Sequence, residues 1–438
     1  MNFVRAIAAL ALVGPLFAQY GGPAILARGQ SPGPMAVSQI DFRPFVSVSG
    51  TYSAGLNGVS VDANGIPVDD SSYGATLSFG ISGMHSWKHT KVGLNYSSGL
   101  SLYAKSFYDG LSSQSFQLSL THQLSRHAVL SLGTSALVAG TNHTTPSLPL
   151  TVEFDPATTY VPTNDFYDNR TIFLSTQASI VIQRSTRLSY SFGGDGFLTR
   201  RRSTALFGSK GAGAHGDVQY RTGRRSTVGV MYSYMHYWFN GIYGSTDSHT
   251  VGGTYSVTLS RSTQFSATAG VSRYENLFVE IVPVDPAIAA IIGISSAQRV
   301  TYYANFTPDL AARLSRVVPR GAVFLNASHG INPGNGLFLT STSTNIGGGY
   351  NYSGLRRWAI AAGVNYNTST SQGNVFGQYG SYSANVSASR QVAPMTHGVF
   401  SFNLRKFDSG DFTNYNKWSY SVNLGLSFSP GDIPVRLW

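Results

Sequence analysis

The segment Thr250–Tyr274 limits what this chain can fold into more than any other, because its apolar and polar residues alternate with the two-residue period of a β-strand. Its first half places apolar residues such as Val251 and Leu259 on one face. Its second half continues with Phe265 and Val271 after a basic turn. Small polar residues occupy the opposite face of both halves, so the segment predicts a β-hairpin with one apolar and one small polar face.

The length of these strands indicates a membrane. Each runs for about ten residues, which is the length that a tilted strand needs to cross a bilayer. Hydrocarbon leaves the open edge of a sheet without hydrogen-bond partners, so strands cross only when the sheet closes into a barrel. The pattern therefore predicts an all-β fold, a transmembrane antiparallel up-and-down β-barrel.

The composition suits strands that face lipid on one side and water on the other. Asp, Glu, Lys and Arg make up 11% of the 438 residues, against roughly 25% in soluble domains. Uncharged polar residues and glycine take their place. A barrel grows by adding hairpins, so a chain of this length is compatible with a single large domain.

The first residues have the features of a secretory signal peptide. Arg5 precedes an apolar run, 6–18, that is too short for a membrane-spanning helix. We place cleavage after Ala18, with Ala27 as a second candidate. The predicted organisation is a signal peptide at 1–18, an N-terminal periplasmic segment at 19–41, an outer-membrane barrel at 42–428 and a C-terminal periplasmic tail at 429–438.

Cysteine usage and charge exclude several classes of function. The chain has no cysteine, so it has no disulfide, thiolate metal site or cysteine nucleophile. About half of its 30 cations lie at short, regularly spaced turns and form no continuous basic groove, although the net charge is +11. We therefore expect no nucleic-acid partner, because phosphates require clustered positive charge.

The basic turns repeat along the chain. They centre near residues 89, 126, 185, 224, 262, 318, 356 and 393, so most intervals are 37 to 39 residues. The two longer intervals contain the segments 140–168 and 275–297, which we interpret as long loops at the opposite end of the hairpins. This asymmetry is typical of outer-membrane barrels, whose short turns are periplasmic.

The repeat predicts eighteen strands, with both termini on the periplasmic side. A barrel of sixteen would require two weaker strands, around 187–220, to be irregular. We place the strands at about 42–54, 72–86, 90–103, 113–124, 127–139, 169–183, 187–197, 203–220, 226–239, 248–260, 263–275, 298–313, 320–331, 339–353, 358–369, 380–390, 397–407 and 418–428.

The last patterned strand places Tyr420, Leu424 and Phe428 on one face and ends on this phenylalanine. It resembles the terminal strand by which bacterial barrels are recognised for assembly, although a tail ending on Trp438 follows it. From residue 42 onward the chain resembles the bacterial outer-membrane β-barrel class, which includes porins, neutral-solute channels and exopolysaccharide exit pores. The resemblance implies a location in the outer membrane, and contact with its lipids, with lipopolysaccharide and with the barrel assembly machinery.

The polar faces of the strands consist mainly of Ser, Thr, Asn, Gln and Gly, almost without charge. Ion-selective pores commonly carry rings of charged side chains, whereas hydroxyls and amides suit a neutral solute rich in hydroxyls. We therefore expect a channel for neutral hydrophilic solutes such as saccharides. The alternative is that these residues only hydrate or fill the barrel. The expected pore-lining residues are Thr254, Ser256, Thr258, Ser266, Thr268, Asn345, Asn365, Asn367, Asn385 and Asn423.

Two other functions stay open: an exopolysaccharide export pore with polysaccharide-export components as partners, and a largely closed structural or adhesive barrel that acts through its loops. We do not expect an enzyme, because His122, His236 and His329 are scattered along the strands without a paired nucleophile. We expect no cofactor and no metal site, since His85 and His89 bracket a turn instead of sharing a helix face.

The segment Val279–Ile294 is too apolar to lie exposed in an outer loop. Asp285 and Pro286 stand where a helix has its cap and first residue, which predicts a short helix at about 286–293. Leaving its large apolar side chains in water would forfeit roughly 1.5–3 kcal/mol each, so we expect the segment to fold inward or to bind a partner. The alternative is that it packs on neighbouring loops or dips into the outer leaflet. The expected plug residues are Asp285, Pro286, Ile288, Ile291 and Ile292.

Overall fold

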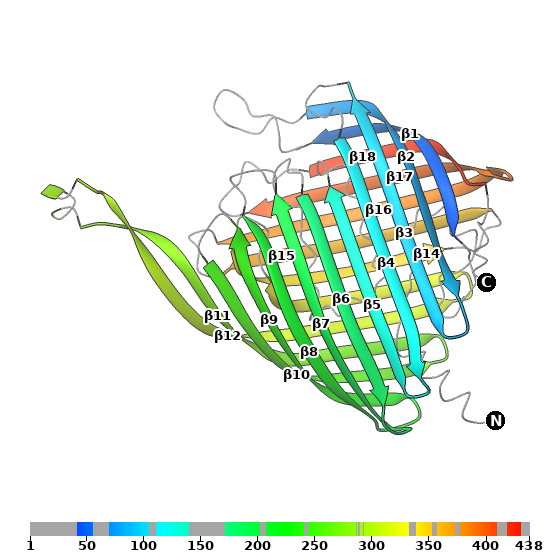
Figure 1. Ribbon diagram of the computed structural model, residues 1–438. Coiled ribbons are helices and arrows are strands. Elements are labelled where there is room, and N and C mark those ends of the chain that lie inside the picture. The colour runs from blue at the N-terminus through cyan, green and yellow to red at the C-terminus, as the bar shows by residue number, and fades with distance from the viewer. Residues whose placement is uncertain are drawn as a thin grey trace.

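The computed structural model describes residues 42–55, 70–104, 111–139, 171–201, 207–240, 244–285, 287, 290–291, 293–332, 339–352, 357–372, 377–409 and 418–430. Over these ranges the chain forms eighteen β-strands (Figure 1). They are β1 (Arg43–Gly55), β2 (Asp70–Ser86), β3 (Thr90–Tyr103), β4 (Leu111–Ser125), β5 (Ala128–Ala139), β6 (Thr171–Gln183), β7 (Leu188–Arg201), β8 (Gly208–Arg221), β9 (Ser226–Asn240), β10 (Gly244–Ser260), β11 (Thr263–Pro283), β12 (Ser296–Val318), β13 (Gly321–Asn332), β14 (Ser341–Tyr352), β15 (Trp358–Ser371), β16 (Gln378–Ala393), β17 (Thr396–Ser409) and β18 (Trp418–Phe428).

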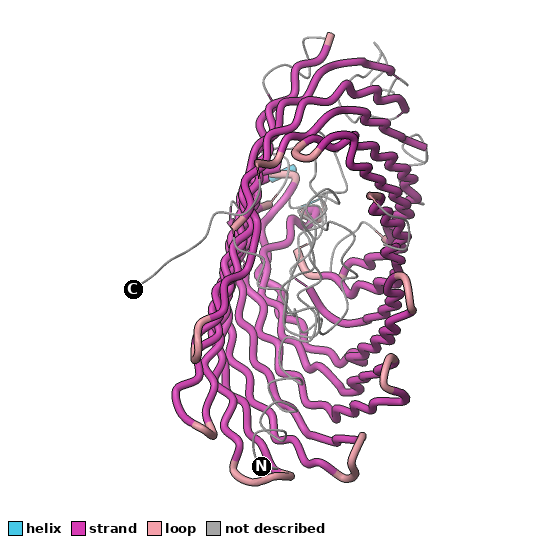
Figure 2. Tube along the Cα trace, turned by 90° about the vertical axis from the view of Figure 1, so that its right-hand side faces the viewer, coloured by secondary structure: helices cyan, strands magenta, loops and turns pink. Residues whose placement is uncertain are grey.

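The sheet closes on itself. Every strand pairs antiparallel with its neighbours in the chain, and β1 also pairs with β18, from Val46 opposite Phe428 to Gly55 opposite Ser419. Figure 2 shows the strands forming a wall around an interior. Closure satisfies the main-chain groups that an open sheet edge would leave in hydrocarbon. The predicted antiparallel up-and-down barrel of eighteen strands is confirmed.

The short basic turns lie at one end of the barrel, and both ends of the described chain lie there too. The Ser429 amide donates to the carbonyl of Met395, in the turn between β16 and β17, at 2.9 Å. The Ser429 hydroxyl donates to the carbonyl of Pro44, near the start of β1, at 3.0 Å. In outer-membrane barrels the end with the short turns is periplasmic. We call the opposite end, with the longer connections, the outer end.

Hydrogen bonds between distant strands identify the inner face of the barrel. The Thr246 hydroxyl of β10 lies 2.8 Å from the hydroxyl of Thr340, just before β14. The Tyr274 hydroxyl of β11 donates to Gln372, just after β15, at 2.6 Å. Strands that are not neighbours can make such contacts only across the interior. Thr246 and Tyr274 therefore point inward, and every second residue along their strands shares this inner face.

The opposite, outer face carries a band of large apolar side chains. Exposed members on strands around the barrel include Val48, Leu77, Leu100, Leu132, Leu174, Val230, Val251, Val271, Leu325, Val364 and Leu424. Amphipathic pairs flank the band: Arg390 lies 5.3 Å over the Trp358 ring next to a short turn, and Lys406 lies 5.7 Å over the Trp418 ring near the outer end. This arrangement is the lipid-facing surface of an outer-membrane barrel.

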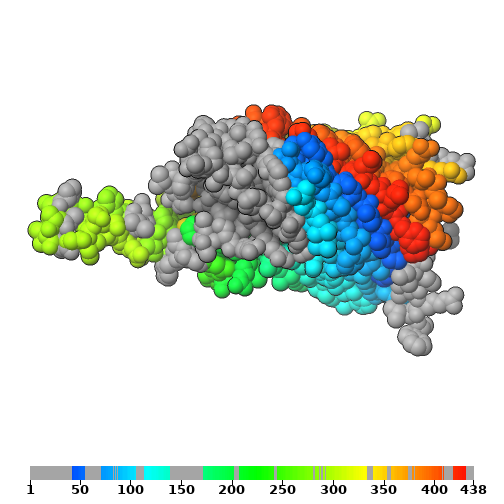
Figure 3. Space-filling model, turned by 90° about the horizontal axis from the view of Figure 1, so that it is seen from above, coloured from blue at the N-terminus to red at the C-terminus, as the bar shows by residue number. Residues whose placement is uncertain are grey.

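The outer ends of β11 and β12 form a hairpin arm that projects beyond the barrel (Figures 1 and 3). β10 stops pairing with β11 at Phe278, and beyond this point the described strand residues 279–283 and 296–300 pair only with each other. We call residues 279–300 the arm. The predicted loop at 275–297 is wrong at both of its ends, because β11 continues to Pro283 and β12 starts at Ser296. Phe, Val and Ile favour strands here, but beyond the bilayer nothing forces them to alternate with polar residues.

Candidate functional site

The ten predicted pore-lining residues all lie on the inner face. Thr254, Ser256 and Thr258 share the face of Thr246 on β10, and Ser266 and Thr268 share the face of Tyr274 on β11. The other five follow from cross-strand partners, which share a face. Thr268, Ala311, Ser328, Asn345 and Asn367 lie opposite one another in turn, Asn365 lies two residues from Asn367, Asn385 lies opposite Gly363, and Asn423 lies opposite Ser401. Their contact with a solute stays a prediction.

Neutral side chains on the inner face bond to one another across neighbouring strands. Thr51 donates to Asn423 Oδ1 at 2.6 Å, and Asn423 Nδ2 donates to the Ser401 hydroxyl at 3.0 Å. The hydroxyls of Ser135 and Ser175 form a similar pair at 2.7 Å. Hydroxyls and amides keep spare donors or acceptors after one such bond. This wall can therefore exchange hydrogen bonds with a solute that carries hydroxyl groups.

The expectation of an almost uncharged inner face needs correction, because several strands place a charged residue on it. Asp195 Oδ1 lies 3.6 Å from His215 Nδ1, and Asp309 accepts a hydrogen bond from Ser272 at 3.3 Å. Applying the same two-residue alternation to every charged residue would have found them. Among the described residues, the charged side chains on this face are Arg43, Lys91, Asp195, Arg201, Asp217, Arg221, Asp309, Arg313 and Arg405. The basic residues in this set outnumber the acidic ones, six to three.

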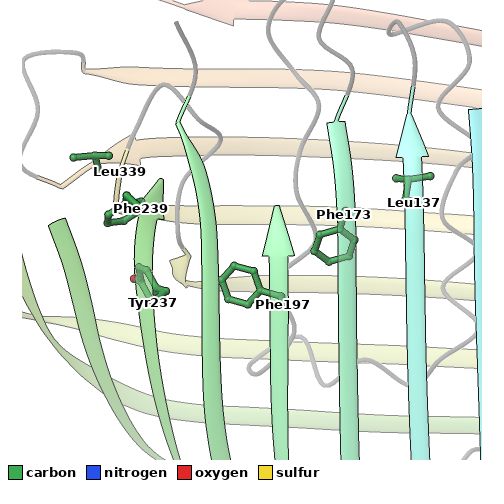
Figure 4. Packing of buried hydrophobic residues seen from close by; sticks show 6 residues of the cluster. All are labelled: Leu137, Phe173, Phe197, Tyr237, Phe239 and Leu339. Carbon is green, nitrogen blue, oxygen red and sulfur yellow. The ribbon is translucent and has the colours of Figure 1, made fainter. Parts of the chain in front are cut away.

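An apolar cluster that the sequence did not indicate lies on the inner face (Figure 4). β5 ends two residues after Leu137 and β9 ends one residue after Phe239, so the cluster lies at the outer end. Phe197 packs there because Gly211 is its cross-strand partner: a Cβ at Gly211 would lie 2.5 Å from the Phe197 ring. The buried members are Leu137, Phe173, Phe197, Tyr237, Phe239 and Leu339, and Phe207, Met235, Phe278 and Ile331 pack against them.

The predicted helix at the tip of the arm begins as expected, but the tip does not fold inward. Asp285 Oδ1 accepts a hydrogen bond from the Ala287 amide at 2.8 Å, and Ala287, Ala290 and Ile291 are helical. Ile291 is 84% exposed, on an arm that projects away from the lumen. The two strands of the arm pair with each other from Val279 opposite Val300 to Pro283 opposite Ser296, so the arm continues the hairpin beyond the barrel. Pro286, Ile288 and Ile292, the other expected plug residues, lie outside the described residues.

Replacing residues 285–294 with an Asn-Gly turn is therefore expected to leave single-channel conductance unchanged. The Val284 amide donates to the Ser295 carbonyl at 3.1 Å, so the two ends are close enough for a tight turn. Recording in planar bilayers measures the conductance, and heat-dependent mobility on a gel controls for assembly. A clear rise in conductance would mean that the tip enters the pore after all.

The three histidines that the sequence analysis weighed for catalysis lie on the outer face. His236 Nδ1 lies 2.7 Å from Asp247, and His329 Nδ1 lies 2.8 Å from the hydroxyl of Thr344. His122 lies on the same face of β4. Within the described ranges, no group of three His, Cys, Asp or Glu residues is placed to hold a metal ion. No helix in this part of the chain is both long and apolar enough to cross a membrane.

Comparison with known proteins finds distant similarity only. No family model and no curated protein matches the chain. OccAB4 from Acinetobacter baumannii is 10% identical, with a TM-score of 0.38, over 92% of this chain and 99% of that one. OpdK from Pseudomonas aeruginosa, solved with vanillate, is 12% identical, with a TM-score of 0.38, over 89% and 98%. The FrpB iron transporter from Neisseria meningitidis is 8% identical, with a TM-score of 0.41, over 84% and 62%. Similarity at this level is too low to carry an argument. The fold, and the inner and outer faces of the barrel, are therefore assigned from the strand pairing of this chain alone.

Proposed function

We propose that this barrel is a passive outer-membrane channel for small neutral hydrophilic solutes of the saccharide type. The observation that carries the proposal is an inner face on which Ser, Thr and Asn predominate, as where Asn345 of β14 lies opposite Asn367 of β15. Such groups exchange hydrogen bonds with the hydroxyls of a passing solute without holding it in a deep electrostatic trap. The charged residues are spread over many strands, so the field along the lumen is weak.

Proteoliposomes containing the barrel are expected to swell in an isotonic monosaccharide, while empty liposomes do not. In a salt gradient the reversal potential is expected to be small and to lean toward anions, because the inner face carries more basic than acidic residues. Swelling with a sugar acid of the same size gives the matched control, and its rate is expected to be similar. A strong preference for one ion sign, or exclusion of the neutral sugar, would contradict the proposal.

The arm supports a second candidate function, in which the barrel acts through its outer surface. Ile291 and Val300 are exposed on it although both are large and apolar. Channel recordings separate the two candidates, because a correctly assembled barrel without conductance favours the surface role. Lipopolysaccharide, the assembly machinery and polysaccharide-export components stay predicted partners.

A further inference from the structure

Side chains from distant parts of the chain meet across the outer end of the lumen in one connected set of hydrogen bonds. We call this set the latch; it consists of Thr246, Tyr274, Asn276, Thr340 and Gln372. The Thr246 hydroxyl donates to Asn276 Oδ1 at 2.8 Å. Because that hydroxyl has a single proton, the Thr340 hydroxyl must donate to Thr246, 2.8 Å away. The Tyr274 hydroxyl donates to Gln372 Oε1 at 2.6 Å.

Thr340 and Gln372, the two latch residues next to β14 and β15, are also bonded to each other. The Gln372 amide donates to the Thr340 carbonyl at 2.8 Å, and Gln372 Nε2 donates to the hydroxyl of Thr342 at 3.1 Å. The Gln372 carbonyl accepts a further bond from Asn276 Nδ2 at 3.4 Å. The start of β14 and the end of β15 are therefore one unit, fastened to the inner face of β10 and β11.

Four of the five latch residues are buried from water, although they lie inside a barrel with a polar wall. Thr246 is 0% exposed, Tyr274 is 1% exposed and Thr340 is 2% exposed. In an open aqueous pore water would hydrate these hydroxyls, whereas here they depend on one another for partners. Leu339, next to Thr340, belongs to the apolar cluster, and Figure 4 shows it beside Phe239. Polar bonds and apolar packing therefore hold the same segment.

Beside the latch, the pairing between β12 and β13 stops before the outer ends of these strands. β12 pairs with β13 only from Val318 opposite Gly321 to Leu310 opposite His329. Over the described residues beyond Leu310, β12 pairs with β11 alone. Main-chain bonds to β12 therefore do not resist an outward movement of the outer ends of β13 and β14. The latch, together with the packing of Leu339 in the apolar cluster, ties these ends to the inner face.

We propose that the latch is a gate that holds the outer mouth of the channel narrowed, and that its release widens the path for solutes. The proposal rests on the channel function proposed above. The gate therefore consists of Thr340 and Gln372 with their partners, and not of the tip of the arm, where the sequence analysis expected a plug. The solutes that would pass the open gate are those of the proposed channel, which are small, neutral and hydrophilic.

The first experiment removes two latch hydroxyls with little change of shape, in the double variant Thr340→Val with Tyr274→Phe. We expect the ratio of open to closed time in planar bilayers to rise about tenfold, as for the loss of two buried hydrogen bonds. The matched control is Thr344→Val with Tyr232→Phe. It also removes one threonine hydroxyl and one tyrosine hydroxyl, but from the outer face. There Thr344 lies 2.8 Å from His329 and Tyr232 lies 2.9 Å from His249. Heat-dependent gel mobility confirms that both variants assemble.

The second experiment locks the gate and stays decisive if the first variant assembles poorly. The chain has no cysteine, so Thr246→Cys with Thr340→Cys introduces one disulfide where the two hydroxyl oxygens are 2.8 Å apart. We expect the oxidised protein to stay in the low-conductance state. A reductant is expected to release it and to raise the open time above that of the wild type, because thiols replace the two latch hydroxyls and form weaker hydrogen bonds.

The outcomes separate the gate from the channel. Suppose that the wild-type protein conducts and that the latch variant and the cross-linked variant both gate as it does. This result would overturn the gate and leave the channel function intact. If neither the wild type nor any assembled variant conducts ions or admits sugars, the channel function fails and the gate fails with it. Opening in the latch variant alone, with the outer-face control unchanged, supports both.

Discussion

Substituting Gly425 with valine is expected to destabilise the closed barrel. Gly425 of β18 lies opposite Ser49 of β1, in the pairing that joins the last strand to the first. A Cβ at Gly425 would lie 2.6 Å from both Cα and Cβ of Ser49, which is closer than carbon atoms approach, so the two strands must move apart. Overpacking of this kind typically costs about 1–3 kcal/mol. Here the cost falls on a seam that no hairpin turn joins.

Gly50→Val is the matched control, because Gly50 lies on the same seam, opposite Leu424. A Cβ at Gly50 would meet nothing nearer than the Leu424 carbonyl oxygen at 3.9 Å. Urea unfolding of the refolded barrel, followed by heat-dependent gel mobility, measures both variants. We expect Gly425→Val to unfold at a clearly lower urea concentration and Gly50→Val to resemble the wild type. Equal stability of the two variants would show that the seam tolerates a side chain at Gly425.

The strand pattern was predictable because the bilayer imposes it. Lipid requires an apolar residue at every second position of each crossing, so the sequence predicted a strand at 90–103, and β3 spans Thr90–Tyr103. The prediction failed at β11 and β12, which continue past the bilayer to Pro283 and from Ser296. Beyond the bilayer a strand no longer has lipid on one face and the lumen on the other. Alternation is then no longer required, and a long strand resembles a loop.

The candidate site was predictable only where it repeats the strand pattern. Small polar residues such as Thr254 and Asn365 follow from alternation alone. Phe173 and Tyr237 stand on the face that alternation marks as polar, where an aromatic residue interrupts the pattern and does not by itself indicate a cluster. Thr340 and Gln372 lie just outside strands, where no period applies. Their partners are 94 and 98 residues away in the chain, and only closure of the barrel brings them together.

An arginine at Val364 is expected to disable the barrel, whereas an arginine at the next residue, Asn365, is expected to leave it folded. Val364 is 64% exposed on the outer face of β15, midway between the strand ends at Trp358 and Ser371, and therefore faces hydrocarbon. Arginine at the bilayer midplane of such barrels costs about 2–4 kcal/mol. Asn365 points into the lumen, where water hydrates a guanidinium group.

The two variants test the assignment of faces and the channel together, because they add the same side chain to consecutive residues. We expect Val364→Arg to lower the folded fraction in membranes and the urea concentration at half unfolding. We expect Asn365→Arg to assemble normally, to lower single-channel conductance and to shift the reversal potential toward anions, since it places a fixed positive charge on the inner face. If Asn365→Arg fails to assemble while Val364→Arg assembles, the inner and outer faces are reversed. If Asn365→Arg assembles and leaves both electrical properties unchanged, Asn365 does not line the conducting path.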